Sequence, residues 1–285
     1  MSRGRADIAE IERFVAYLAE PGDVIELRAL EARQGNRVVT VSGYFDQATV
    51  LAAAAAELSG KAAGVYVTLN RTHSAVLSRR ANRTEAVGEK GTLTSDNDIV
   101  RRTRLLIDCD AVRPRGIAST EAEHEHGIAR ARDVRAFCKE SGWPDPLLID
   151  SGNGAHLIYG IDLPVADAGL VKSLLKSLSG AFSDANVTID QTVHNPARIT
   201  KLCGTLACKG ENSAERPHRL ARILEAPETV AIVTSAQIEA VIAATAQPAE
   251  KVVNPRDGKS GGAKRFDLPA WLQEAGIEFG APRPW

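Results

Sequence analysis

The chain has 285 residues, of which 44% are hydrophobic and 25% are charged, a composition that is ordinary for a folded globular protein. Its formal net charge is −1, which excludes nucleic-acid binding by overall charge alone and leaves only local basic patches for such a role. No apolar run reaches the ~20 residues of a membrane span, and the N-terminus has no signal-peptide core, so a cytoplasmic protein is expected.

The N-terminal third is expected to combine two helices with strands. Apolar residues at helical spacing predict a helix from Ile8 to Leu18, which the turn residues of EPGD end. A second helix is predicted over 47–58, with Asp46 as its N-cap. Strands are expected at 24–30, 37–45 and 64–70. Residues 71–100 are polar and weakly periodic, which favours a functional loop.

The rest of the chain mixes short strands with helices. Thr120 and Glu123 form a possible capping box for a helix that ends near Gly142. Further helices are expected at 170–182 and 235–245. Strands are expected at 105–108, 146–150, 156–163, 186–190 and 218–225. Because strands and helices are mixed without strict βαβ alternation, an α+β fold is favoured.

Four cysteines occur in a chain that is too long to need disulfides for stability. Cys203 and Cys208 have C-x₄-C spacing, but no second pair with metal-site spacing accompanies them. Free thiols are therefore favoured over structural zinc.

Two aspartates end a predicted buried strand. Asp108 and Asp110 follow Leu105, Leu106 and Ile107, and their side chains share one face because successive strand side chains alternate. Two carboxylates this close repel each other unless a proton or a cation lies between them. Taken alone, the pair fits either exposed residues at a strand end or a site for Mg²⁺ or Mn²⁺.

Two later stretches also carry polar residues typical of a binding site. SGNGAH is predicted to form a turn whose backbone N–H groups make an anion-binding nest, and His156 beside it is able to donate a hydrogen bond to a phosphate. VTID ends at Asp190, and basic residues follow it. A carboxylate followed by cations suits a metal-bound triphosphate. The basic residues are Arg198, Lys201 and Lys209.

Together the three stretches resemble the motifs of the archaeo-eukaryotic primase superfamily. LLIDCD is similar to its hydrophobic-D-x-D motif, SGNGAH to s-x-H and VTID to hydrophobic-D, in the same order. The flanking text VYVTLN, VRPRGIASTE and NPARITKLCGT resembles phage- and plasmid-type primase-polymerases (PrimPol domains). The similarity covers about residues 20–225, and Cys109 and Cys203 depart from it only at variable places.

The resemblance implies an α+β fold of the archaeo-eukaryotic primase type, with an RRM-like catalytic sheet packed against an N-terminal α/β module. It implies a template-dependent nucleotidyltransferase, a DNA primase or DNA polymerase, that joins NTPs or dNTPs by a two-metal mechanism. The implied partners are a single-stranded DNA template and a primer strand. The implied setting is phage, plasmid or mobile-element replication in a bacterial or phage-infected cytoplasm.

The resemblance also implies roles for individual residues. Asp108, Asp110 and Asp190 would bind two divalent cations, Mg²⁺ or Mn²⁺, and with His156 would form the catalytic set. The implied nucleotide-binding residues are Ser151, Asn153, His156, Arg198, Lys201 and Lys209. Short basic clusters are either a solvated face or contacts to the DNA backbone. The residues expected to make such contacts are Arg79, Arg80, Arg101 and Arg102.

Residues 1–246 are expected to form the catalytic domain, followed by a Pro-, Gly- and Lys-containing linker at 247–265. Residues 266–285 resume helical patterning, with an apolar side that includes Trp271 and Leu272. This segment is expected either to begin a downstream region, with a helicase in the same parent chain, or to pack back onto the catalytic domain as a brace.

Two other functions stay open on the residues alone. A metal-dependent nuclease also uses a D-x-D pair, although it does not need the SGNGAH turn or the cations after Asp190. A non-catalytic RRM-like module that binds single strands would need exposed aromatic residues for stacking, and aromatic residues make up only 5% of the chain.

Overall fold

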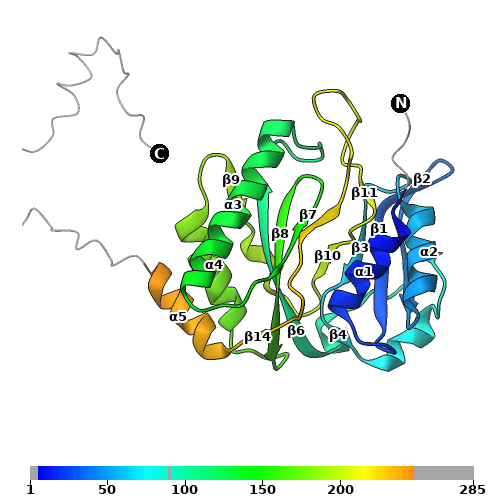
Figure 1. The fold of residues 1–285 in the computed structure, drawn as a ribbon. Coiled ribbons are helices and arrows are strands. Elements are labelled where there is room, and N and C mark those ends of the chain that lie inside the picture. The colour runs from blue at the N-terminus through cyan, green and yellow to red at the C-terminus, as the bar shows by residue number, and fades with distance from the viewer. Residues whose placement is uncertain (1–5, 89–90, 247–285) are drawn as a thin grey trace, which may run out of the picture. The chain divides into compact units, whose positions relative to one another are not determined.

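The computed structural model describes residues 6–88 and 91–246, which form two large sheets and a small two-stranded one (Figure 1). The two large sheets contribute to one hydrophobic core. The first sheet has the strand order β10-β3-β1-β2-β5. Its strands are β1 (Ile25–Gln34), β2 (Arg37–Phe45), β3 (Gly64–Thr68), β5 (Glu85–Ala86) and β10 (Ile199–Lys201). The late strand β10 returns to this N-terminal sheet, which brings the segment after Asp190 next to β3.

Two helices pack with the first sheet, α1 (Ile8–Leu18) and α2 (Ala48–Leu58). Asp7 caps α1 by accepting a hydrogen bond from the Glu10 N–H at 3.1 Å. The apolar positions Ile11 and Phe14 are fully buried, as the helical spacing predicts. Each such side chain contributes about 1.5–3 kcal/mol through burial.

The second sheet has the order β13-β7-β8-β6-β4, with β14 added to β8 and β9 added to β6. Its strands are β4 (Arg71–Thr72), β6 (Ile99–Ala111), β7 (Leu147–Asp150), β8 (Gly154–Leu163), β9 (Val187–Ile189), β13 (Arg222–Glu225) and β14 (Ile232–Val233). Figure 1 shows its helices on the side turned away from the first sheet. They are α3 (Glu121–Glu140), α4 (Leu170–Phe182) and α5 (Ser235–Thr245).

The remaining regular elements are short. The strands β11 (Leu206–Ala207) and β12 (Arg219–Leu220) pair with each other. Three 3₁₀ helices are η1 (Ser74–Arg79), η2 (Asp96–Asp98) and η3 (Gln191–His194). None of the helices described is long and apolar enough to cross a membrane.

The α+β class expected from the sequence is confirmed. The helix at 170–182 has the predicted bounds, and the capping box of α3 forms between Thr120 and Glu123. All four cysteines are free thiols. The predictions for the linker and for the helix at 266–285 lie outside the described residues.

Three local predictions are wrong. Asp46 does not cap α2; its carboxylate accepts from the Asn82 amide at 2.8 Å, and Gln47 is the N-cap without a side-chain bond. Residues 71–100 are not a single loop, because they contain β4, η1, β5 and η2 and reach the start of β6. The strand expected at 218–225 is split at buried Ala221, whose N–H bonds the Thr205 carbonyl, so β12 and β13 join different sheets.

Candidate active site

The register of β6 places its two aspartates between β8 and β9. Across the pair with β8, Asp108 faces His156 and Asp110 faces Gly154. Across the pair with β9, Asp110 faces Thr188. The two carboxylates therefore lie on one face of the sheet, as strand alternation predicts, with an imidazole beside the first and a glycine beside the second.

Gly154 is needed because the backbones approach closely behind the carboxylates. A Cβ at Gly154 would lie 2.4 Å from the Cys109 carbonyl oxygen and 3.3 Å from the Asp110 Cα. From the helix side, a Cβ at Gly127 of α3 would lie 2.8 Å from the Gly154 Cα. Two glycines thus let α3, β8 and β6 meet directly beneath the site.

A cavity of about 210 Å³ opens in front of these residues. Its walls come from β6 and β8 of the second sheet and from β3 and β10 of the first. We call it the carboxylate cavity. All nine residues predicted to bind metal or nucleotide line it: Asp108, Asp110, Ser151, Asn153, His156, Asp190, Arg198, Lys201 and Lys209.

The aspartates are close enough to disfavour each other's charge. Burial raises the pKa of Asp108 well above its ordinary value of 3.8, and the charges of Asp110 and Asp190 raise it further. The Asp190 N–H donates to the Asp108 carbonyl at 3.0 Å, which ties the end of β9 to β6. Three carboxylates in one partly enclosed space are a suitable donor set for a hard divalent cation.

The same side chains are presently engaged with neighbours. Arg113 donates to Asp110 at 2.8 Å, and the Asp190 carboxylate accepts from the Thr192 N–H at 2.7 Å. In this arrangement no three His, Cys, Asp or Glu side chains of the described residues form a metal-holding group. The donor chemistry fits Mg²⁺ or Mn²⁺, and binding would require Asp110 to share its oxygens with Arg113.

His156 is buried between the two sheets. Its Nδ1 lies 3.1 Å from the Thr200 hydroxyl on β10, and its Nε2 lies 3.6 Å from an Asp108 oxygen. Burial lowers the pKa of His156 from 6.5 to about 4, with Asp110 opposing that effect. The imidazole is therefore neutral at neutral pH and able to donate one hydrogen bond.

Two of the basic residues that line the cavity lie on or next to β10 of the first sheet. Lys201 is 3% exposed, and its Nζ donates to the Leu206 carbonyl at 2.8 Å and lies 5.5 Å from the Tyr66 ring centre. Burial lowers the pKa of Lys201 to about 7. Arg198 donates to Asn195 at 2.9 Å and to the Thr192 carbonyl at 2.7 Å.

The SGNG turn is stabilised from within, and the predicted nest is only partly available. The Ser151 N–H donates to the Gly154 carbonyl at 3.0 Å, and the Gly152 N–H donates to Asp150 at 2.6 Å. The Asn153 side-chain oxygen accepts from the Ser119 N–H at 2.9 Å. These two amides therefore bind the chain itself, and Asn153 positions the turn as well as lining the cavity.

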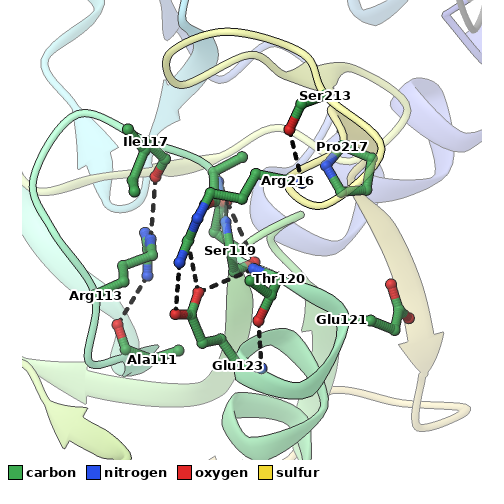
Figure 2. Close-up of polar contacts among 12 residues, drawn as sticks. Ala111, Arg113, Ile117, Ser119, Thr120, Glu121, Glu123, Ser213, Arg216 and Pro217 are labelled. Carbon is green, nitrogen blue, oxygen red and sulfur yellow. Dashed lines mark hydrogen bonds and ion pairs between the residues drawn. The ribbon is translucent and has the colours of Figure 1, made fainter.

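The segment that carries Lys209 is tied to the start of α3. Arg216 forms two bonds with the Glu123 carboxylate, at 2.8 and 2.9 Å, and donates to the Ala118 carbonyl at 2.7 Å (Figure 2). These bonds hold the pKa of Glu123 below its ordinary value. Arg219 adds bonds to Ser119 and Glu121. The β11–β12 connection is thus fixed at the rim of the cavity.

The four arginines predicted to contact DNA lie outside the carboxylate cavity and bind the chain. Arg80 and Arg102 are only 6% and 5% exposed, and they bond Thr92 and Asp167. The other two pair with acidic residues: Arg79 with Asp98 and Arg101 with Asp162. Each arginine has an intramolecular role, and a DNA role for them stays a prediction.

The Arg79–Asp98 pair predicts a loss of stability in acid. Hydrogen bonds from Arg79 lower the pKa of Asp98 from 3.8 to about 2. Because the folded carboxyl takes up its proton at lower pH than the unfolded one, its stabilising effect is complete above pH 3.8 and is lost as the pH falls toward about 2. In thermal melts, Asp98→Asn should be less stable than the wild type at about pH 5, and the difference should shrink toward pH 2. A difference that stays constant with pH would contradict this role.

Several residues of the site are not part of the three sequence motifs. Arg113 lies outside the three motifs, and Thr200 is brought to His156 by the return of β10 to the first sheet. Tyr66, in the VYVTLN stretch, forms part of the wall beside Lys201. Burial raises its pKa to about 12. Packing between the sheets is what identifies Thr200 and Tyr66 as neighbours of the site.

No protein-family profile matches the chain, and no curated protein matches it in sequence. Two solved structures are similar over 84% of the chain at 13% identity. One is the crystal structure of primase RepB', with a TM-score of 0.42 over 61% of that protein. The other is the catalytic domain of primase RepB' in complex with initiator DNA, with a TM-score of 0.40 over 92% of that chain. The chain therefore spans less than two thirds of the first protein.

Proposed function

We propose that the chain is a template-dependent nucleotidyltransferase, a DNA primase or DNA polymerase, as its three motifs imply by resemblance. One observation carries the proposal. Asp108, Asp110 and Asp190 line a single cavity together with Arg198, Lys201 and Lys209. Carboxylates for cations and basic groups for phosphates in one space suit a metal-bound nucleoside triphosphate.

Asp108, Asp110 and Asp190 would hold two divalent cations, Mg²⁺ or Mn²⁺, which when bound would lower the pKa of the acceptor hydroxyl and offset the charge of the leaving phosphates. Arg198 and Lys209 would orient the triphosphate. A phosphate near Lys201 would favour its charged form and offset the effect of burial on its pKa. His156, neutral and held by Thr200, would donate to a phosphate oxygen.

The partners follow from this chemistry. The incoming nucleotide is an NTP or a dNTP, and the acceptor is the 3′-hydroxyl of a primer strand on a single-stranded DNA template. For priming, a second nucleotide would serve as the acceptor. A link from residues 247–285 to a helicase stays a prediction.

The two alternatives explain fewer of these residues. A metal-dependent nuclease would use the aspartates but has no need of three basic side chains in the same cavity. A single-strand binding module would need stacking surfaces. Among the described residues that line the carboxylate cavity, Tyr66 is the single aromatic residue of the Phe, Tyr and Trp type.

Incubation with a primed template, labelled nucleotides and Mn²⁺ or Mg²⁺ separates the three functions. Extension of the primer would support the transferase. Shortening of the strands would support the nuclease, and binding without either would support the non-catalytic module.

Replacing His156 should weaken nucleotide use without abolishing it. Loss of one hydrogen bond to a charged group costs about 1.5–3 kcal/mol, so His156→Ala should raise the dissociation constant of the nucleotide by roughly 10- to 100-fold. Titration of the nucleotide in the presence of the divalent cation measures this directly.

His126→Ala is the matched control, because His126 is exposed on α3 and does not line the cavity. It should bind nucleotide as the wild type does. Unchanged nucleotide affinity in His156→Ala would leave His156 with a packing role only.

A further inference from the structure

Asn70, which ends the VYVTLN stretch, is only 5% exposed and makes three hydrogen bonds to distant parts of the chain. Its side-chain oxygen accepts from the N–H groups of Thr103 and Arg104, both at 2.9 Å. Its side-chain nitrogen donates to the Pro196 carbonyl at 2.9 Å. The reverse orientation of the amide would turn its NH₂ group toward two N–H donors, so these bonds fix one orientation. Asn70 therefore joins β6 to the chain that follows η3.

The bonds on the β6 side come from an irregular place in that strand. The pairing of β6 with β8 shifts register between Arg102 and Arg104, which disrupts the ladder locally. Asn70 supplies the acceptor for the two N–H groups at this shift. The same strand continues to Asp108 and Asp110. Asn70 is thus attached to the strand that carries two of the three aspartates of the site.

On the other side, Asn70 bonds the segment that carries Arg198. We call residues 194–198, from the end of η3 to the start of β10, the Arg198 segment. Hydrogen bonds with residues 69–102 hold its backbone. They run from Arg102 to the His194 carbonyl at 2.5 Å, from Asn70 to the Pro196 carbonyl at 2.9 Å, from the Ala197 N–H to the Asp96 carboxylate at 2.8 Å and from the Leu69 N–H to the Arg198 carbonyl at 2.9 Å.

The side chain of Arg198 is held from within the same part of the chain. Its Nε donates to the Asn195 side-chain oxygen at 2.9 Å, and a terminal nitrogen donates to the Thr192 carbonyl at 2.7 Å. The guanidinium lines the carboxylate cavity. Because the side chain is bonded to its own segment, its place in the cavity follows the place of that segment.

We propose that Asn70 and Asp96 are positioning residues, which set the place of the Arg198 guanidinium relative to the aspartates of β6. This role rests on the proposed function, in which Arg198 orients the triphosphate. A displacement of about 1 Å caused far from the chemistry can cost on the order of 100-fold in rate. A buried link between the strand with the carboxylates and the segment with the arginine keeps cation-binding and phosphate-binding groups at a matched spacing.

Asn70→Asp tests the link to the Arg198 segment separately from the link to β6. The ionised carboxylate keeps the size of the side chain and still accepts from the two N–H groups of β6. It has no hydrogen to donate to the Pro196 carbonyl, and its charge repels that oxygen. In a titration with divalent cation present, the dissociation constant of the nucleotide should rise by roughly tenfold. The kcat of primer extension should fall by less than about threefold, because the aspartates stay in place.

The same substitution in an Arg198→Ala background separates positioning from a general loss of structure. Once the guanidinium is absent, a displaced segment should change the dissociation constant of the nucleotide by less than about twofold. If Asn70 only supported the fold, Asn70→Asp would weaken nucleotide binding by the same factor in both backgrounds.

Asp96→Ala is the second probe, at an exposed position where the variant is expected to fold. It removes the acceptor of the Ala197 N–H and should raise the dissociation constant of the nucleotide by about two- to fivefold. This rise should also vanish in the Arg198→Ala background. Asp96→Asn removes the same charge but keeps an acceptor oxygen, so it should bind nucleotide as the wild type does.

Asn82→Asp is the matched control for Asn70→Asp. The Asn82 side-chain nitrogen donates to the Asp46 carboxylate at 2.8 Å, so this substitution also replaces a donor by a repelling charge. Of the described residues, neither Asn82 nor Asp46 lines the carboxylate cavity. The control should lose stability and keep the nucleotide affinity of the wild type. Melting curves check that each variant is folded at the temperature of the titration.

The outcomes are distinct. Weaker nucleotide binding in Asn70→Asp that disappears in the Arg198→Ala background supports the positioning role, and Asp96→Ala decides it if Asn70→Asp does not fold. Wild-type affinity in the folded variant, or an equal loss in both backgrounds, overturns the role and leaves the proposed function intact. A wild type that binds nucleotide but extends no primer overturns the proposed function, while the titration still decides the role of Asn70. A wild type that binds no nucleotide overturns both.

Discussion

Asp108→Asn is expected to abolish nucleotide incorporation while leaving the fold intact. The substitution keeps the size of the side chain and removes the charge that would hold the cation. Replacing a residue that only supports a metal ligand lowers metal affinity or activity by about 10- to 100-fold. Loss of a ligand itself should therefore lower the rate of incorporation by more than about 100-fold. Asp110→Asn should behave alike. Primer extension at saturating Mn²⁺ measures the loss.

Binding and stability provide independent readouts of the same variants. In a calorimetric titration, Asp108→Asn should bind Mn²⁺ more weakly than the wild type. Without metal its melting temperature should equal or exceed that of the wild type, because Asp108, Asp110 and Asp190 repel each other. Asp162→Asn is the matched control, since Asp162 is exposed on β8 and pairs with Arg101. Wild-type incorporation by Asp108→Asn at saturating Mn²⁺ would contradict the metal-ligand assignment.

Gly154→Ala is expected to destabilise the protein and to displace Asp110. The added Cβ would lie 2.4 Å from the Cys109 carbonyl oxygen, a backbone atom of β6 that is held by its sheet partners. Overpacking of this kind costs about 1–3 kcal/mol, which corresponds to a fall of roughly 2–12 °C in melting temperature for a domain of this size. Incorporation should fall even at a temperature where the variant is folded, because the strand that carries Asp110 must move.

Gly180→Ala is the matched control for this substitution. Gly180 lies within α4, and a Cβ there would have no atom within 4 Å. The control should gain about 0.5–1 kcal/mol, since Ala favours a helix over Gly. Equal melting temperatures for Gly154→Ala and the wild type would mean that β6 and β8 are not packed as tightly as their contacts indicate.

Local sequence patterns were sufficient for the elements whose determinants lie within a few residues. The helix α4 has the predicted bounds because its apolar spacing and its flanking turns are all local. The capping box of Thr120 and Glu123 could be predicted from the sequence for the same reason. Strand alternation placed Asp108 and Asp110 on one face before any tertiary contact was known.

Predictions failed where distant partners decide the local structure. The strand expected at 218–225 is divided because Ala221 bonds Thr205, and no pattern within the segment reveals that partner. Asp46 bonds Asn82 rather than a helix N-terminus. The basic clusters also have distant partners, since buried Arg102 pairs with Asp167, although a DNA role for these arginines stays a prediction. The sequence around Arg102 does not indicate that an acidic residue 65 positions later will bind it.

The sequence by itself determined the identities and order of the acidic, imidazole and basic residues, and the face on which the two strand aspartates lie. The tertiary structure alone decided that these residues line one cavity, because the chain leaves the second sheet after β9 and then pairs with β3 of the first sheet as β10. It also placed Thr200 beside His156 and Thr188 across from Asp110. The physical reason is that backbone periodicity is set by neighbours in the chain, whereas strand pairing and side-chain partners depend on contacts between segments that are far apart in it.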